Sequence, residues 1–387
     1  MKYVPWLAPP LALLLAACGG GAAPASTAPA KPSEAAKPAA SAAPASAAAA
    51  SKPAAASASA NPAASASAKP AGSASAAAKP AASGLTKVSY AYASVNPLHY
   101  VAAVAGEKPD LFGKYGIQFD GVTTTNSPNA VNALVGGSVN FAATTPDSMW
   151  PAQDKAPDVK QVAAVTDGTP YVLIAQPDIK RAADLKGKTF GASAVRGGAD
   201  TTSIMVMMLE NGVKPNEYTI VQAGSVSDRT VAMKAKSIQG LAQLEPQASL
   251  LRNEGFPEID NANNYGSLKN VQSITLSAKK SWYEGNPTLA ANFIKGWMDT
   301  TKWIYDPANK AELLAITKKT MSVGDKEAEN AYNLHIPNKM VSPDLHIDEK
   351  KALQFIDNLK KTGAADNLPS DPAKYIDNSL VDRALKS

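Results

Sequence analysis

Short apolar runs divide the chain after residue 84 into strand-length segments. These runs, rich in Val, Ile, Tyr, Phe and Thr, predict strands at 87–93, 118–123, 140–144, 159–165, 171–176, 189–194, 218–223, 240–244 and 271–277. Between them, apolar residues recur at helical spacing and predict helices at 130–135, 202–211, 229–236 and 246–253. Strands that alternate with helices are typical of an α/β fold, and we expect mainly parallel sheets.

The pattern changes after about residue 281, where helical periodicity continues without further strands. It predicts helices at 287–304, 310–320, 326–334 and 348–362, which are separated by Asp306-Pro307, Ile336-Pro337 and Ser342-Pro343. A proline disfavours the helical conformation in the residue before it, so these dipeptides mark helix boundaries. A helical region of this length has to cover a sheet or bridge two lobes.

Two segments repeat the same order of features. Residues 132–146 and 233–246 each contain a helix end, a tight polar turn, a strand of small residues, and a polar loop that leads to a proline. The chain after residue 84 also exceeds the size at which one hydrophobic core usually stops growing. We therefore expect two lobes, each with one of these segments.

The N-terminus carries the pattern of a secretion signal. Lys2 precedes an apolar run at 7–17 that is too short for a permanent membrane span and ends in Leu15-Ala16-Ala17-Cys18. Small residues before a cysteine resemble the lipobox of bacterial lipoproteins, and Cys18 is the only cysteine, so it cannot form an internal disulfide. We predict a signal peptide at 1–17 and lipidation of Cys18. The alternative is a cysteine that happens to end a plain signal peptide.

Residues 18–84 have a composition that cannot build a core. After Cys18 they are almost entirely Ala, Ser, Pro, Gly and Lys, with no aromatic and no branched aliphatic residue. Because the prolines interrupt any helix that the alanines favour, we expect a disordered tether. Recurring Lys-Pro pairs leave attraction to anionic lipid or cell wall as an alternative to a plain spacer.

The formal net charge of +5 arises entirely before residue 85. Residues 1–84 hold six of the 38 basic residues and one of the 33 acidic residues, so the rest of the chain carries 32 of each. A neutral folded part lacks the basic surface that nucleic-acid binding requires. We therefore expect no nucleic-acid partner.

Several segments occur in an order that resembles a known superfamily. They lie at 90–97, 111–117, 134–144 and 183–191, followed by Glu245-Pro246 before 250–256. Over about 85–368, this order resembles the periplasmic-binding-protein superfamily, in the class that includes the nitrate, taurine, alkanesulfonate and thiamine-pyrimidine receptors. The chain departs from the pattern at 237–241, where Gln239-Gly240 stands in place of an acidic residue common in that class. That loop therefore carries no inference about the solute.

The resemblance implies a two-lobed, type II-like α/β fold with a helical C-terminal region. Because the chain crosses twice between lobes in that superfamily, we place the first lobe at 85–176 plus 271–387 and the second lobe at 177–270. Together with the N-terminal pattern, the resemblance leads us to expect an extracytoplasmic lipoprotein, anchored to the membrane in the periplasm or on the outer face. We expect it to be a monomer without a cofactor. It would deliver a small organic or anionic solute to the permease subunits of an ABC importer. A sensory receptor that is not coupled to transport stays an alternative.

The solute is expected between the lobes, at loops that follow the carboxyl ends of strands, and hinge bending would close the lobes around it. Most candidates there are short polar groups. From the first lobe they are Ser94, Asn96, His99, Asn126, Ser127, Thr144, Thr145 and Asp147, and from the second lobe Ser193, Arg196, Gly197, Gly198, Asp200, Thr201, Leu244 and Glu245.

Residues 193–202 form the sharpest local candidate, because a predicted strand end passes through Gly197 and Gly198 into a helix. Free N–H groups and the helix dipole favour an anion at such a terminus, and Arg196 would add a bidentate contact to a carboxylate, sulfonate or phosphate. The alternative is structural: Asp200 or Thr201 caps the helix, and Arg196 pairs with a surface acid.

An enzyme of the same fold, acting on a small heterocycle or acid, is a further alternative. No cysteine follows Cys18 and the three histidines are scattered along the chain, which excludes a Cys/His catalytic pair and disfavours a multi-histidine metal site. Gly187-Lys188-Thr189 is not a phosphate loop, because Ala182 replaces the required first glycine and the triplet precedes a predicted strand. We therefore predict binding without catalysis and without a metal.

Overall fold

The first of two sheets is built mainly from the N-terminal part of the folded chain. The computed structural model describes residues 84–364, 368 and 371–387, all of which fall in one compact unit. The predicted signal peptide, Cys18 and the tether up to residue 83 lie outside these residues. The first sheet consists of β1 (Thr86–Tyr92), β2 (Ile117–Thr123), β3 (Phe141–Thr144), β4 (Val159–Ala164) and β10 (Thr275–Lys279), in the order β2-β1-β3-β10-β4.

The second sheet repeats this arrangement. It consists of β5 (Val172–Ala175), β6 (Thr189–Ala192), β7 (Thr219–Gln222), β8 (Gly240–Gln243) and β9 (Glu258–Asn261), in the order β7-β6-β8-β5-β9. The two segments that repeat in the sequence supply β3 and β8, which are the central strands of the two sheets and lie beside β1 and β6 respectively. The expectation of one such unit in each half is confirmed.

Three sequence predictions need correction. The sheets are mixed rather than mainly parallel, because β10 is antiparallel to β3 and β4, and β5 is antiparallel to β8 and β9. The chain enters each of these strands from a segment that has just crossed from the other half, 165–171 before β5 and 270–274 before β10. Pairing with β8 also places 172–175 in the second sheet, although we expected this stretch in the first lobe. Finally, β9 was not predicted, because its short, mostly polar sequence at an edge lacks an apolar pattern.

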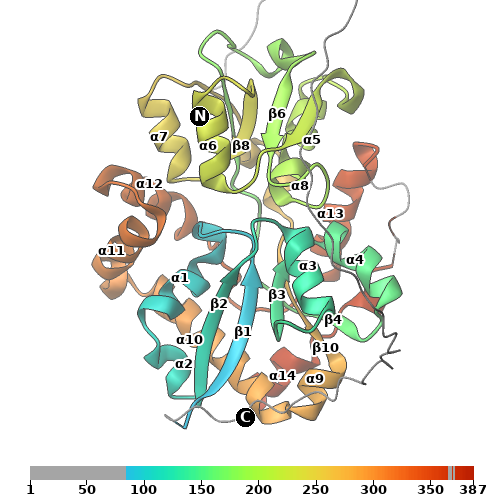
Figure 1. Cartoon of the computed structure of the whole chain (residues 1–387), viewed down its shortest axis with the longest axis vertical. Coiled ribbons are helices and arrows are strands. Elements are labelled where there is room, and N and C mark those ends of the chain that lie inside the picture. Colours follow the sequence, from blue (N-terminus) through green and yellow to red (C-terminus); the bar gives the residue numbers. More distant parts are fainter. Residues whose placement is uncertain (1–83, 365–367, 369–370) are drawn as a thin grey trace, which may run out of the picture. The chain divides into compact units, whose positions relative to one another are not determined.

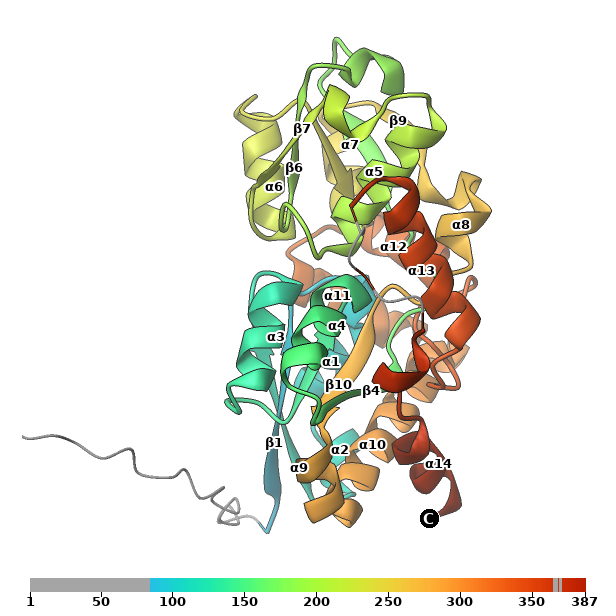
Figure 2. The ribbon, with the colours of Figure 1, turned by 90° about the vertical axis from the view of Figure 1, so that its right-hand side faces the viewer.

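Helices cover both sheets, and we name the two halves by what they contain (Figures 1 and 2). The first lobe is the first sheet with α1 (Tyr100–Glu107), α2 (Asp110–Gly113), α3 (Ser127–Val135), α4 (Pro146–Lys155), α9 (Lys280–Gly285), α10 (Pro287–Tyr305), α11 (Lys310–Met321) and α14 (Ser379–Lys386). The second lobe is the second sheet with α5 (Ala199–Glu210), α6 (Val226–Lys234), α7 (Gln247–Asn253) and α8 (Gly266–Lys269).

The C-terminal helices join the lobes, as their predicted length required. α12 (Asp325–His335) contacts α11 in the first lobe and α7 in the second, and α13 (Glu349–Lys361) contacts α4, α5 and α8 (Figure 2). α10 packs on the first lobe because Ala290, Phe293, Ile294 and Trp297 recur at helical spacing and are buried on one face. Pro287 starts this helix, and Asp306-Pro307 follows its end.

Two short segments carry the chain between the lobes, at 165–171 and 270–274. They are hydrogen-bonded to each other, with Gly168 N–H donating to the Val271 carbonyl at 2.6 Å and Val165 N–H to the Ile274 carbonyl at 3.0 Å. This paired connection lies beside the space between the sheets and provides a hinge axis for lobe movement.

Candidate ligand-binding cleft

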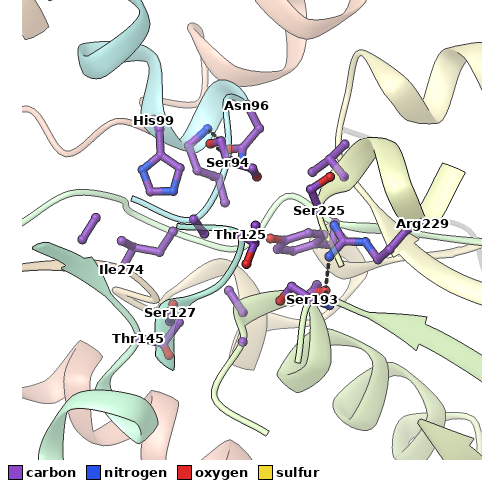
Figure 3. Close-up of a pocket in the computed structure, with 18 residues that line it drawn as sticks. Ser94, Asn96, His99, Thr125, Ser127, Thr145, Ser193, Ser225, Arg229 and Ile274 are labelled. Atoms are coloured by element: carbon purple, nitrogen blue, oxygen red, sulfur yellow. Dashed lines mark hydrogen bonds and ion pairs between the residues drawn. The ribbon is translucent and has the colours of Figure 1, made fainter. Parts of the chain in front are cut away.

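A cavity between the lobes is lined by both halves of the chain (Figure 3). It holds about 470 Å³ of empty space, part of which is open to solvent. Its walls begin where strands of the two sheets end. The lining residues are Ala93, Ser94, Asn96, Leu98, His99, Thr125, Ser127, Ala143, Thr145, Tyr171, Ser193, Gly198, Ala199, Asp200, Ser225, Val226, Arg229 and Ile274.

The wall after β1 is set by the side chain of Asn96. Its carbonyl oxygen accepts from Leu98 N–H at 2.9 Å and caps the short 3-10 helix Pro97–His99, while its amide donates to Ser94 Oγ at 3.0 Å. Asn96 thus fixes Ser94 on one side of the loop and His99 on the other.

His99 is an uncharged group in this wall. Its side chain is buried and burial lowers its pKa to about 3, so the imidazole is neutral at physiological pH. Nδ1 lies 3.3 Å from the hydroxyl of Tyr90, in the core of the first lobe. Nε2 has no hydrogen-bond partner among the residues that the structure describes.

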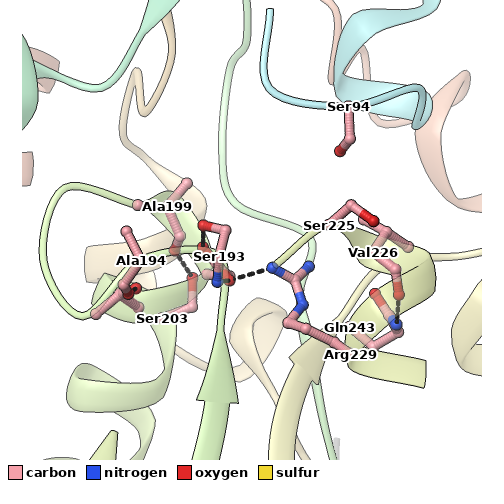
Figure 4. Close-up of polar contacts among 12 residues, drawn as sticks. Ser94, Ser193, Ala194, Ala199, Ser203, Ser225, Val226, Arg229 and Gln243 are labelled. Carbon is pink, nitrogen blue, oxygen red and sulfur yellow. Dashed lines mark hydrogen bonds and ion pairs between the residues drawn. The ribbon is translucent and has the colours of Figure 1, made fainter. Parts of the chain in front are cut away.

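The opposite wall contains a buried ion pair. Arg229 of α6 donates from Nη1 to Asp200 Oδ2 at 2.5 Å, and the two side chains are 2% and 3% exposed. Ser193 donates to the same carboxylate twice, from its N–H to Oδ2 and from its hydroxyl to Oδ1, each at 2.7 Å (Figure 4). Asp200 is therefore well supplied with donors.

Arg229 has N–H donors that no described residue accepts. A guanidinium has five N–H donors, but one bond from it is formed within the described chain, and Nε is buried without a partner. The Nη groups also carry N–H donors that no described residue accepts, and these are the donors that can meet an acceptor brought into the cavity. The charges of Arg229 and Asp200 cancel, so this wall is polar without a large net charge.

Two helix N-termini adjoin the same wall. α5 follows Gly198, which offers no side-chain cap, and α6 follows Ser225, whose hydroxyl accepts from Asp228 N–H at 3.3 Å. The first N–H groups of a helix lack intrahelical acceptors and carry partial positive charge. Together with Arg229 they favour a solute group that accepts hydrogen bonds or is negatively charged.

Thr125 is held in a conformation that its side chain disfavours. Its φ of +70° lies in the left-handed region, where a β-branched residue is rare. Asn129 holds the turn, since its amide donates to the Thr124 carbonyl at 3.0 Å and to Thr125 Oγ1 at 3.1 Å. Backbone strain of this kind concentrates at ligand-binding loops, and here it orients one wall of the cavity.

The lobes touch directly beside the cavity. Ser148 Oγ donates to the carbonyl of Gly197 at 2.9 Å, and it lies 3.0 Å from the hydroxyl of Thr145 in the cavity wall. A Cβ on Gly197 would be 2.3 Å from Ser148 Oγ, and the φ of Gly197 is +76°. A glycine is therefore required for this close approach.

The structure brings together only part of the set expected from the sequence. Eight of the candidates line the cavity: Ser94, Asn96, His99, Ser127, Thr145, Ser193, Gly198 and Asp200. Other candidates serve the fold instead. Asn126 caps α3, Thr144 lies within β3 beside Ser277, Thr201 donates to the Ala194 carbonyl, and Gly197 contacts Ser148.

Two charged candidates, Arg196 and Glu245, do not line the cavity. Arg196 donates to the Ala364 carbonyl at 2.9 Å and borders a separate groove beside α3 and α4, because the loop directs its side chain outward. Glu245 pairs with Arg252 and accepts from Ser249 Oγ at 2.6 Å, so its carboxylate is held by α7. Asp147 and Leu244 are also absent from the lining.

Sequence reasoning missed several lining residues, above all Arg229, Tyr171, Thr125 and Ile274. Ser225 had a usable signal, since it follows β7 as Ser94 follows β1. Arg229 sits in a helical stretch where nothing local distinguishes it from a surface arginine. The hinge residues Tyr171 and Ile274 were read as strand.

Two features are absent from the described part of the chain. No group of three or more His, Cys, Asp or Glu side chains there is placed to hold a metal ion. Among the same residues, no helix combines the length and the apolar character needed to cross a bilayer.

Known proteins share this fold and part of this sequence. A model of the NMT1/THI5-like family matches residues 96–311. A protein of Brucella abortus (strain 2308) named "Putative binding protein" is 33% identical over 123 residues, which is 32% of this chain and 37% of the relative. The match thus spans little more than a third of that relative's length.

Solved structures match most of the described chain. The alkanesulfonate-binding protein SsuA from Xanthomonas axonopodis pv. citri, bound to MOPS, has a TM-score of 0.60 at 14% identity over 77% of this chain and 97% of that one. The periplasmic nitrate-binding protein NrtA from Synechocystis PCC 6803 has a TM-score of 0.63 at 14% identity over 78% and 89%. The fold is that of periplasmic solute-binding proteins.

Proposed function

The chain belongs to the NMT1/THI5-like family, and from that premise we propose that it is the solute-binding lipoprotein of an ABC importer. The observation that carries the proposal is the cavity between two similar lobes, with polar groups from both lobes around it and a paired hinge beside it. Such a site buries a small solute when the lobes close. The closed form would then dock on permease subunits.

We propose that the solute carries an anionic or strongly hydrogen-bond-accepting group that binds at Arg229. Arg229 lines the cavity with Nη donors that no described residue accepts, and the first turns of α5 and α6 lie in the same wall. The opposite wall contributes the neutral His99 and the apolar side chains of Leu98 and Ile274. This asymmetry favours a small organic solute with one polar end.

The location of the protein is also a proposal. The N-terminal pattern of Lys2, the apolar run at 7–17 and Cys18 supports export followed by lipidation. A lipid at Cys18 and the tether to residue 84 would hold the receptor at a membrane surface outside the cytoplasm. Mass spectrometry of the membrane-bound mature chain tests this, since a mature N-terminus at an acylated Cys18 is expected and an unmodified N-terminus elsewhere would contradict it.

We propose that the site binds its solute without turnover. The hydroxyl of Ser193 donates to Asp200, which is already paired with Arg229, so no free base activates it. His99 Nδ1 lies against the Tyr90 hydroxyl and not against Ser193. Recovery of an unchanged ligand after long incubation with the protein is the expected result.

Thermal unfolding of the purified chain against a panel of sulfonates, carboxylates, nitrate and pyrimidines tests the binding function. A ligand present at 100 times its Kd stabilises the folded state by about 2.7 kcal/mol, which is readily measured. We expect a shift with one class of compound that is lost in Arg229→Met and kept in Arg196→Met. Arg196 is the matched control, since it is an arginine beside the cleft that does not line the cavity. A shift lost in Arg196→Met and kept in Arg229→Met would refute the assigned site.

A further inference from the structure

We propose that Tyr90 donates its hydroxyl proton to His99 Nδ1, which leaves Nε2–H as a donor directed at the bound solute. The two atoms of this contact lie 3.3 Å apart, and both residues are buried. Tyr90 therefore acts as a positioning residue that sets the tautomer of a cavity side chain. The step from the tautomer to the solute rests on the binding function proposed above.

The direction of the bond follows from what else Tyr90 can reach. Its hydroxyl has no hydrogen-bond partner other than His99 among the described residues. If Nδ1 carried the proton and donated, the Tyr90 proton would be buried without an acceptor. Such an unpaired buried donor is more costly than an oxygen with a spare lone pair, so the hydroxyl donates.

The rings around His99 keep it in place without competing for its protons. Tyr92 stacks on Tyr90 with ring centroids 5.4 Å apart, and its ring lies 5.4 Å from that of His99. No carboxylate or ammonium group of the described residues is hydrogen-bonded to the His99 ring. Burial raises the pKa of Tyr90 well above its ordinary value. Tyr90 is thus a proton donor at every pH at which the protein is expected to work.

Nε2 is free to meet a solute. It has no partner in the described chain and is not among the enclosed unpaired atoms, and His99 lines the cavity. Figure 3 shows His99 and Arg229 on opposite sides of the cavity, from the first and second lobes respectively. A solute that satisfies both needs an oxyanion or similar group at Arg229 and a second, uncharged acceptor at His99. A cationic group at that second position would meet an N–H donor and be rejected.

Nitrogen NMR of the full chain, labelled with ¹⁵N-histidine, tests the tautomer without any ligand. The chain contains three histidines, so His335→Gln and His346→Gln variants assign the His99 signals. We expect an unprotonated Nδ1 and a protonated Nε2 at neutral pH. Tyr90→Phe should shift the Nδ1 signal, because that nitrogen loses the hydrogen bond it accepts, whereas Tyr92→Phe, which removes a neighbouring hydroxyl with no bond to His99, should not. A protonated Nδ1 in the native chain, or no change in Tyr90→Phe, would overturn the proposal.

A pair of sulfonates tests the consequence for the solute. Isethionate carries a hydroxyl where propanesulfonate carries a methyl group, so the two differ in one acceptor at similar size. One neutral hydrogen bond of about 1 kcal/mol predicts an affinity for isethionate about fivefold higher. His99→Gln, whose amide nitrogen reaches about the position of Nε2, should keep the preference, and His99→Leu should lose it.

The NMR experiment and the sulfonate comparison distinguish a failure of this inference from a failure of the proposed function. Equal binding of both sulfonates to the native chain would refute the inference that His99 binds a second, uncharged acceptor, while leaving the binding function intact. Absence of binding by both would count against the anionic solute of the proposed function, and the NMR result would still decide the tautomer.

Discussion

Replacing Arg229 by methionine should cost far more stability than removing a surface cation. The guanidinium and its partner Asp200 are 2% and 3% exposed, so the substitution leaves a carboxylate in the interior with only the two donors of Ser193. Removing one partner of a buried ion pair typically costs about 3 to 5 kcal/mol. We expect a loss of unfolding free energy in that range. Lys234→Met is the matched control, because its pair with Glu254 is 43% and 44% exposed and should contribute less than about 1 kcal/mol.

A double-mutant cycle separates the pair from its surroundings. Asp200→Asn alone leaves a buried guanidinium without its carboxylate and should also be strongly destabilising. The double variant Arg229→Met/Asp200→Asn removes both charges, so its loss should be smaller than the sum of the single losses by several kcal/mol, about what a coupled buried pair shows. The assay is guanidinium denaturation followed by circular dichroism, with comparable m-values required for comparison. The reasoning fails if Arg229→Met costs no more than Lys234→Met, or if the two single losses add.

Three further predictions follow from local geometry. Gly197→Ala should lower the unfolding free energy by about 1 to 3 kcal/mol, because a Cβ is disfavoured at a φ of +76° and would clash with Ser148. In a Ser148→Ala background, denaturation should show that only the part of this loss caused by the clash is recovered. Burial lowers the pKa of His335 to about 4, so the stability it contributes is complete above its ordinary pKa of 6.5 and is lost as pH falls through that window. Urea unfolding measures how much unfolding free energy each chain loses between pH 7 and pH 4. That loss should be smaller in His335→Gln than in the native chain by on the order of 3 kcal/mol, and equal losses would contradict this. Gly296→Ala should destabilise by about 1 to 2 kcal/mol, since its Cβ would lie 2.6 Å from an aromatic ring of α2, whereas Gly285→Ala, with nothing within 4 Å, should be neutral or stabilising by thermal unfolding.

The order of strands and helices could be predicted because the spacing of apolar residues is a property of each segment alone. Every predicted strand and every predicted helix is present, and ends shift by only a few residues. Apolar runs such as 159–165 are buried on both faces wherever the sheet places them, so their identity does not depend on the partner strand. The direction of β5 and β10 was not readable, because it depends on which lobe the chain has just left.

The candidate site likewise has a part that the sequence predicted and a part that it did not. Ser94 and Ser193 follow strands β1 and β6, and a strand end directs its next residues toward the edge of the sheet where a cleft forms. Proximity to a strand end was therefore a sound guide for short side chains. It failed for long ones, because a long side chain is directed by packing around its own helix or loop.

The choice between two arginines shows this most clearly. Arg196 stands next to a glycine loop at a helix start, and the sequence favoured it for an anion contact, yet its side chain turns outward to the Ala364 carbonyl. Arg229 lies in an ordinary helical stretch, but β7 pairs with β6, which brings α6 against the start of α5 and Arg229 onto Asp200. Residues 29 positions apart become an ion pair only through that strand pairing.

What the sequence determined by itself is the order of strands and helices, the two-part organisation, the neutral charge of the folded part and the small polar residues at strand ends. These follow from composition and from periods of two and 3.6 residues, which each segment carries alone. Only the tertiary structure decided which side chains face one another across the cleft, that His99 is buried and neutral beside Tyr90, and that Arg229 rather than Arg196 lines the cavity. Those outcomes depend on desolvation and on contacts between distant segments, which exist only once both lobes have folded.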